Sequence, residues 1–258
     1  MLSAALSILL YFLSWAAPGY RLEANQETLD FVPVGVRYDP DPNPAIRRTD
    51  LENMRRLRFT VIAPGRPGTE PAETLSRIDR LLARSQDASL TVQGSEVGTV
   101  PIDEATGADS VREAAWTRLA YGARAVIFED WNALQKNDTA LGAAAAFADT
   151  LARNAALYVP LRRVEATGDR AFTIDGGQDK VEAHWLESPD ALLLIAVNHA
   201  AEPTDVTLTF APAIPEAIWQ NMLTGNAVNF VAGPTGPVYK RTFAAREVLV
   251  LMIRKKWK

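Results

Sequence analysis

The chain has 258 residues, of which 48% are hydrophobic and 22% charged, and its net charge is −4. This composition is typical of a globular protein with one large domain or two ordinary ones, and it offers no basic surface that would favour nucleic acid as a partner. The absence of cysteine excludes disulfides, thiol nucleophiles and cysteine-bound metals. The two histidines, His184 and His199, lie far in sequence from the acidic residues at 129–130, and no glycine-rich phosphate motif is present. We therefore expect neither a metal nor a cofactor.

The N-terminal segment, residues 1–20, is uncharged and is apolar from residue 2 to residue 18. Its length matches the apolar region of a signal peptide followed by a small-residue cleavage zone at "WAAPG", although no Lys or Arg precedes the apolar run. We expect export to the periplasm or the cell exterior. A membrane anchor and a buried first helix are the alternatives.

Residues 28–160 alternate between apolar segments and segments with helical periodicity. Near-continuous apolar strands separated by amphipathic helices are typical of parallel strands covered by helices. The expected strands are 31–38, 59–64, 89–97 and 124–128, and the expected helices are 50–59, 71–85, 108–123 and 140–158. Thr49 or Asp50 is the expected cap of the first helix, and Gly122 is expected to end the third.

After residue 165 the hydrophobic period changes to two, and short strands alternate with Gly, Pro, Asn and Asp. This pattern predicts an antiparallel β-sandwich at 165–258. The expected strands are 180–187, 191–200, 204–210, 217–222, 227–231, 238–243 and 247–253.

Three segments resemble parts of a known family. "FVPVGVRYDPDPNPAIRRTDLENMRRLRFTVIAP" resembles the opening of a glycoside hydrolase (β/α)8 barrel of the β-galactosidase-like kind, and "DSVREAAWTRLAYGARAVIFEDW" resembles the last helix and strand of such a barrel. "NMLTGNAVNF" and "REVLVLMI" are similar to the small β-sandwich appended to many glycosidases. The three segments follow one another in the order that the family has.

The resemblance implies a shortened barrel. Eight β/α units take about 250 residues, whereas residues 28–160 provide room for about four units. The first two and the last two strands are represented, and the middle of the barrel is missing. The implied fold class is α/β plus all-β, with a partial (β/α) TIM-barrel-like domain at 28–160 followed by the antiparallel sandwich. Because such a sheet is open, its edges favour association into a homo-oligomer.

The implied function is that of a glycoside hydrolase-like protein that acts on or binds carbohydrate, by a two-carboxylate mechanism if it is active. One alternative is a non-catalytic carbohydrate-binding or assembly protein derived from a glycosidase fold. The other is a different α/β protein with a β-sandwich, whose likeness to glycosidases is accidental. The two carboxyls of a retaining enzyme must lie about 5–5.5 Å apart, which separates the first reading from the second.

Glu96 and Glu129 are the candidate catalytic residues, because such residues follow the carboxyl ends of barrel strands. The resemblance places Glu96 where the penultimate strand carries the nucleophile. Glu129 is the candidate proton donor, because it follows "AVIF", an apolar wall that would favour the protonated carboxyl. Solvated surface positions are the alternative for both residues.

Four further residues are candidates for substrate binding, namely Arg37, Tyr38, Asp130 and Trp131. Arg37 and Tyr38 end the first strand and can hydrogen-bond to sugar hydroxyls, whereas Trp131 can stack on a pyranose ring. Three of them have a structural alternative: an ion pair for Arg37, a helix cap for Asp130 and a core position for Trp131.

Overall fold

The computed structural model describes residues 31–39, 41–64, 97–214 and 219–255. The N-terminal segment, the expected helix at 71–85 and all but the last residue of the expected strand at 89–97 lie outside these ranges. The chain divides into two compact units, the first comprising residues up to Ala108 together with Ala123–Val159, and the second comprising Asp109–Gly122 together with residues from Pro160 onward.

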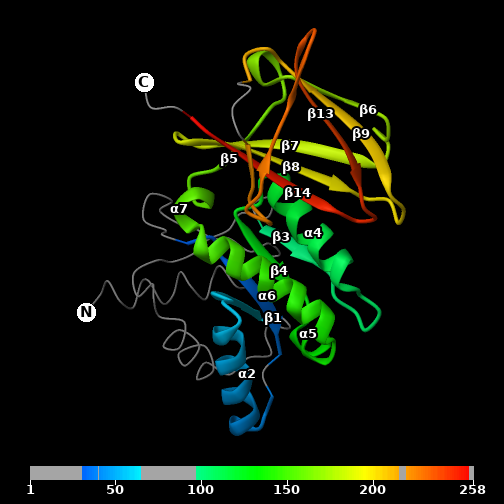
Figure 1. The fold of residues 1–258 in the computed structure, drawn as a ribbon. Helices are drawn as coiled ribbons and strands as arrows, with labels where there is room; N and C mark the ends of the chain where they lie inside the picture. The colour runs from blue at the N-terminus through cyan, green and yellow to red at the C-terminus, as the bar shows by residue number, and fades with distance from the viewer. Residues whose placement is uncertain (1–30, 40, 65–96, 215–218, 256–258) are drawn as a thin grey trace, which may run out of the picture. The chain divides into compact units, whose positions relative to one another are not determined.

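The first unit contains a four-stranded sheet in which every pairing is parallel (Figure 1). The strands are β1 (Val34–Tyr38), β2 (Val61–Pro64), β3 (Val97–Val100) and β4 (Ala125–Phe128), in the order β2-β1-β4-β3. The prediction of parallel strands in one sheet is therefore confirmed for the described residues.

The strand order distinguishes between two families of parallel sheet. From β1 to β2 and from β3 to β4 the chain moves one strand over, each time in the same direction along the sheet. In a doubly wound sheet the direction of winding reverses, whereas in a (β/α)8 barrel it is constant and the first strand lies between the second and the last. The order β2-β1-β4-β3 is that of the first two and the last two strands of a barrel.

Four described helices belong to the first unit: α2 (Pro44–Arg56), α5 (Trp131–Lys136), α6 (Asp138–Arg153) and α7 (Ala155–Tyr158). Helix α2 begins earlier than the expected position near residue 50, because Asn43 caps it: Asn43 Oδ1 accepts a hydrogen bond of 3.0 Å from the Ala45 N–H. Pro44 occupies the first turn, where its missing N–H is not needed.

Aromatic side chains pack one face of the parallel sheet against these helices. Phe128 meets Phe147 of α6 edge to face, with ring centroids 6.4 Å apart, and Phe59 contacts both Phe128 and Trp131. On β1, the Tyr38 hydroxyl donates a hydrogen bond of 3.0 Å to Asp50 Oδ2 of α2. We call this face of the sheet the helix face.

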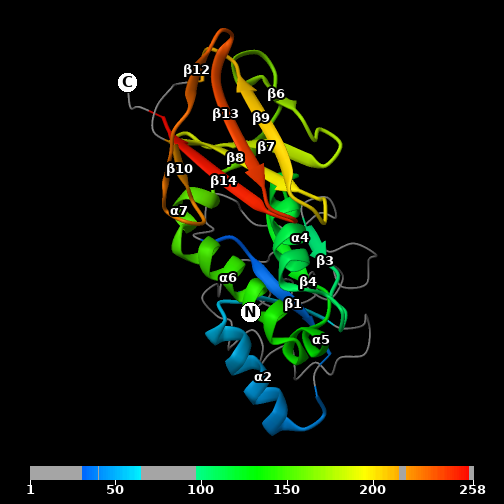
Figure 2. The same ribbon diagram turned by 45° about the vertical axis from the view of Figure 1, so that its right-hand side comes forward.

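The second unit is an antiparallel sandwich (Figure 2). One sheet has the order β11-β10-β14-β8-β7-β5 and the other has the order β12-β13-β9-β6. The prediction of a sandwich is confirmed. Strands β5 and β6 are additional to the predicted strands, and the strand predicted at 227–231 is divided into β11 and β12, which belong to different sheets. The strands are β5 (Arg162–Val164), β6 (Phe172–Asp175), β7 (Val181–Glu187), β8 (Ala191–Asn198), β9 (Thr204–Phe210), β10 (Trp219–Asn221), β11 (Ala227–Val228), β12 (Val231–Gly233), β13 (Gly236–Phe243) and β14 (Val248–Arg254).

Large aromatic side chains fill the sandwich core. Trp185 and Trp219 are fully buried, and the ring of Phe210 lies within 6 Å of both. The buried indole of Trp185 donates a hydrogen bond of 2.8 Å to the Arg170 carbonyl, which satisfies its N–H. These buried rings are large enough for the sandwich to have a core of its own.

Helix α4 (Ala108–Ala120) connects β3 to β4 in the sequence, but its residues from Asp109 onward cluster with the sandwich in the second unit. The helix ends before Gly122, which has a φ of +90° that favours glycine. Its end agrees with the prediction, whereas its place in the second unit was not anticipated. Among the helices in the described ranges, none is long and apolar enough to span a membrane.

Candidate functional site

The register of the parallel sheet decides which side chains share a face. Val36 pairs with Phe128, and Gly35 pairs with Ile127. Because side chains alternate along a strand and paired positions point the same way, Val36, Tyr38 and Phe128 lie on the helix face. Gly35 and Ile127 lie on the face away from α2 and α6, which we call the opposite face.

Extending this register by one position, beyond the last residue of β4, places Arg37 beside Glu129. Arg37 follows Val36 on β1, and Glu129 follows Phe128 on β4, so both occupy the opposite face at the carboxyl ends of their strands. On the other side of β4, the Glu129 N–H donates a hydrogen bond of 2.9 Å to the Val100 carbonyl, so the backbone bonding between β3 and β4 extends to Glu129. The exposure of β1 agrees, since Val36 and Tyr38 are buried whereas Arg37 between them is half-buried.

Glu129 is a half-buried carboxylate whose side chain makes no hydrogen bond or ion pair with another residue in the described ranges. Thr99 of β3 pairs with Ile127 and therefore lies on the same face, one position before the carboxyl end of its strand. The sequence did not single out Thr99, because only the register of β3 against β4 places it near Glu129. The opposite face thus presents a guanidinium, a carboxylate and a hydroxyl at one end of the sheet.

Two of the predicted substrate-binding residues serve the protein core. Tyr38 is 1% exposed and its hydroxyl is bonded to Asp50, so it connects β1 to α2 on the helix face. Burial, together with the Asp50 carboxylate, raises the pKa of Tyr38 above its ordinary value. Trp131 is also 1% exposed and packs against Phe59, which leaves no open ring face for a sugar. The structure supports the core alternative for Trp131 and gives Tyr38 a core position that the sequence did not indicate.

Asp130 is the N-cap of helix α5. Its Oδ1 accepts a hydrogen bond of 3.0 Å from the Ala133 N–H, and its extended backbone ends the segment that follows β4. Because α5 begins at Trp131, its first side chain turns into the core, which explains why Trp131 does not lie at the sheet edge. The cap alternative for Asp130 is thus the one that the geometry supports.

Glu96 lies outside the described residues. The expected strand was to end at 97, but β3 begins at Val97 and runs to Val100. Of the two predicted catalytic carboxyls, the described ranges contain Glu129.

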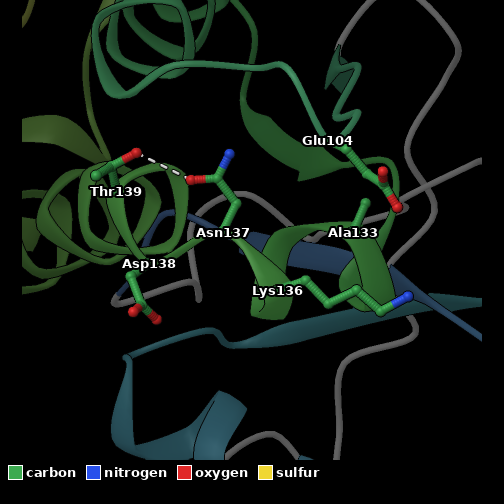
Figure 3. Close-up of a pocket in the computed structure, with 6 residues that line it drawn as sticks. All are labelled: Glu104, Ala133, Lys136, Asn137, Asp138 and Thr139. Carbon is green, nitrogen blue, oxygen red and sulfur yellow. Dashed lines mark hydrogen bonds between the residues drawn. The ribbon is translucent and has the colours of Figure 1, made fainter.

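A hollow of about 350 Å³ lies beside the loop that follows β3 (Figure 3). Its lining residues are Glu104, Ala133, Lys136, Asn137, Asp138 and Thr139. Glu104 and Lys136 extend on the same side of Ala133, and Asp138 points away from them (Figure 3). Asn137 is committed to structure, because its Nδ2 donates to the Thr106 carbonyl and its Oδ1 accepts from the Ala140 N–H. Since no aromatic side chain lines this hollow, it has no platform for a sugar ring.

Metal binding finds no support in the described ranges, which contain no group of three or more His, Asp or Glu side chains placed to hold an ion.

Comparisons with known proteins return glycoside hydrolases among solved structures. A noncanonic maltogenic α-amylase from Thermotoga neapolitana matches over 80% of this chain and 50% of its own length, with 13% identity and a TM-score of 0.41. An Anoxybacillus α-amylase matches over 58% of this chain and 33% of its own, with 10% identity and a TM-score of 0.39. A β-L-arabinopyranosidase from Geobacillus stearothermophilus matches over 67% and 34%, with 6% identity and a TM-score of 0.38.

This chain therefore spans half, or about a third, of the length of these three structures. No family model and no curated protein matches it. With TM-scores below 0.5, the matches do not assign the chain to a family.

Proposed function

We propose that this protein binds carbohydrate at the carboxyl ends of β1 and β4, on the opposite face of the parallel sheet. The observation that carries the proposal is the pairing of Val36 with Phe128, a register that, extended by one position, places Arg37 beside Glu129 at this edge. In barrels that share this strand order, the helices cover the outside, and the face away from them lines the interior, where ligands bind at the carboxyl ends of the strands.

The chemistry of the edge suits a polyhydroxylated ligand. A carboxylate accepts two hydrogen bonds from neighbouring hydroxyls and a guanidinium donates to hydroxyl oxygens, so Glu129 and Arg37 together can bind a vicinal diol. The Glu129 carboxylate is available for this role because it has no partner among the described side chains.

Binding is the function proposed, because hydrolysis with retention requires two carboxyls about 5–5.5 Å apart. Glu129 supplies one of them, and Glu96, the other candidate, lies outside the described residues. The described residues thus have a glycosidase-like arrangement of strands and contain one of the two predicted catalytic carboxyls.

The test is a panel of monosaccharides, disaccharides and aryl glycosides, offered to the wild type and to Glu129→Gln. Hydrogen bonds to a charged group contribute about 1.5–3 kcal/mol, so the substitution should weaken binding of the preferred sugar about ten- to a hundred-fold. Glu52→Gln is the matched control, because Glu52 is an exposed residue of α2 that pairs with Arg48 at 3.6 Å. The affinity of Glu52→Gln for the sugar should equal that of the wild type.

Three outcomes decide the proposal. If the wild type binds no sugar of the panel, the proposal is wrong. If it binds one with equal affinity in Glu129→Gln, the site lies elsewhere. If it hydrolyses an aryl glycoside and Glu129→Gln does not, the site is correct but the protein is a hydrolase, and the statement that it only binds is overturned.

A further inference from the structure

His199 lies between two carboxylates in the second unit. Its Nδ1 is 2.8 Å from Glu113 Oε1 of helix α4, and its Nε2 is 2.9 Å from Glu182 Oε1 of strand β7. A neutral imidazole has one N–H donor and one acceptor nitrogen, whereas an ionised carboxylate can only accept. The Nδ1 contact is a hydrogen bond and the Nε2 contact is an ion pair, and both are favourable at the same time only when His199 carries a proton on each nitrogen.

Other contacts join the same helix to the same sandwich. Arg246 Nη1 is 2.5 Å from Glu113 Oε2, and the Tyr121 hydroxyl at the end of α4 donates a hydrogen bond of 2.7 Å to Glu182 Oε2. Arg246 is held in the left-handed region, with a φ of +52°, by a turn in which its N–H donates to the Ala200 carbonyl. The turn between β13 and β14 is thereby fixed beside the residue that follows His199.

Several charged or titratable groups surround His199, and they come from every element packed against it. They are Glu113 and Tyr121 of α4, Arg163 of β5 over the Tyr121 ring, Glu182 and His184 of β7, the Lys180–Glu202 ion pair beside the end of β8, and Arg246. His184 Nε2 is 3.7 Å from Glu182 Oε2, which is an ion-pair distance and not a hydrogen bond.

The charges in direct contact balance only when His199 is protonated. Glu113 and Glu182 carry one negative charge each and Arg246 carries one positive charge. A neutral His199 therefore leaves a net negative charge among these four residues, which we call the seam. Protonation brings the sum to zero. We propose that protonated His199 fastens helix α4 to the sandwich, so that the attachment of this helix is strong in mildly acidic solution and weaker in alkaline solution.

The titration behaviour of the group agrees with this geometry. Partial burial opposes the charging of His199, but its interactions with the Glu113 and Glu182 carboxylates outweigh burial and raise its pKa. Burial likewise opposes ionisation of Glu182, but its interactions with His184, Tyr121 and His199 prevail and lower its pKa to about 2.

These two perturbed pKa values define a pH window. A raised histidine pKa gives stability that is complete below about 6.5, the unfolded value, and is lost as the pH rises through the folded value. A lowered glutamate pKa gives stability that is present above about 4.3 and is lost as the pH falls toward the folded value. The seam is therefore strongest between about pH 4.5 and pH 6.5.

The first experiment follows the histidine ring signals by NMR in a pH titration of the whole chain. Because the sequence has two histidines, His184→Gln leaves His199 as the single signal and serves as the matched control. We expect a His199 pKa above the ordinary value of about 6.5, and a lower one in Glu113→Gln. A His199 pKa at or below the ordinary value, or one unchanged in Glu113→Gln, overturns the proposal even if a His199 variant does not fold.

The second experiment measures amide hydrogen-exchange protection in α4 at pH 5.5 and pH 8.5. In the wild type and in His184→Gln, protection factors should be lower at the higher pH. The expected ratio of the protection factors at the two pH values follows from the His199 pKa that the NMR titration measures. It is about ten-fold if this pKa lies one pH unit above its ordinary value. In His199→Gln, protection should be low at both values. Equal protection at the two pH values in the wild type refutes the proposed fastening.

Discussion

Replacing Asn198 should destabilise the sandwich more than any exposed substitution, because its side chain makes four hydrogen bonds from a fully buried position. Nδ2 donates to the carbonyls of Glu202 and Ala244, at 3.0 and 2.8 Å. Oδ1 accepts from the Ala200 N–H at 3.1 Å and from the Thr204 hydroxyl at 3.3 Å. The residue therefore joins the end of β8 to the loop before β9 and to the turn that precedes β14.

The magnitude follows from the number of bonds. A hydrogen bond contributes about 0.5–1.5 kcal/mol net, so Asn198→Ala should lower the free energy of unfolding by about 4 kcal/mol. In urea, with a slope near 2 kcal/mol per M, the unfolding midpoint should fall by about 2 M at an unchanged slope. Tryptophan fluorescence is a suitable signal, because Trp185 and Trp219 lie in the core of the same unit.

Asn226→Ala is the matched control, since Asn226 is exposed in the turn between β10 and β11. Its effect should stay within about 0.5 kcal/mol. If Asn198→Ala costs less than about 1 kcal/mol, the buried amide does not hold these loops together and the hydrogen-bond account of the sandwich is refuted.

Three further predictions concern the parallel sheet and can be checked by the same unfolding assay. In Gly35→Ala the new Cβ would lie 2.1 Å from a β2 carbonyl oxygen, so it should cost about 1–3 kcal/mol, whereas Gly142→Ala on open helix surface should be neutral or stabilising. Asp130→Ala removes the α5 cap and should cost about 1 kcal/mol; no loss would mean that the cap is not formed. Tyr38→Phe leaves the buried Asp50 carboxylate unpaired and should cost about 2 kcal/mol, which Asp50→Leu in the same chain should partly restore; an additive loss in the double variant would contradict the pairing.

The sequence indicated the sheets because their cause is local. Four apolar runs between helical patterns predict parallel strands without any knowledge of the tertiary structure. Segments with a hydrophobic period of two predict the sandwich strands for the same reason. The start of α2 was also encoded locally, by an Asn-Pro pair, although the surrounding Asp and Pro residues resembled a loop. Short α5 was missed, because six residues give too little periodicity to recognise.

The candidate site depends on facts that the sequence does not contain. A shift of one residue in register would move Arg37 to the helix face and Tyr38 to the opposite face, so their roles could not be separated beforehand. Trp131 after a strand suits both a sugar platform and a core plug, and the choice depends on where α5 begins. The seam at His199 joins residues more than eighty positions apart, such as Glu113, and no local pattern predicts it.

The most direct test of the carbohydrate site is an NMR titration of the isotope-labelled chain with a sugar that it binds. We expect amide signals to change first at the carboxyl ends of the parallel strands, around Arg37, Thr99 and Glu129, and these changes should disappear in Glu129→Gln. Changes confined to the strands of the sandwich, or changes that persist unaltered in Glu129→Gln, would contradict the proposed site.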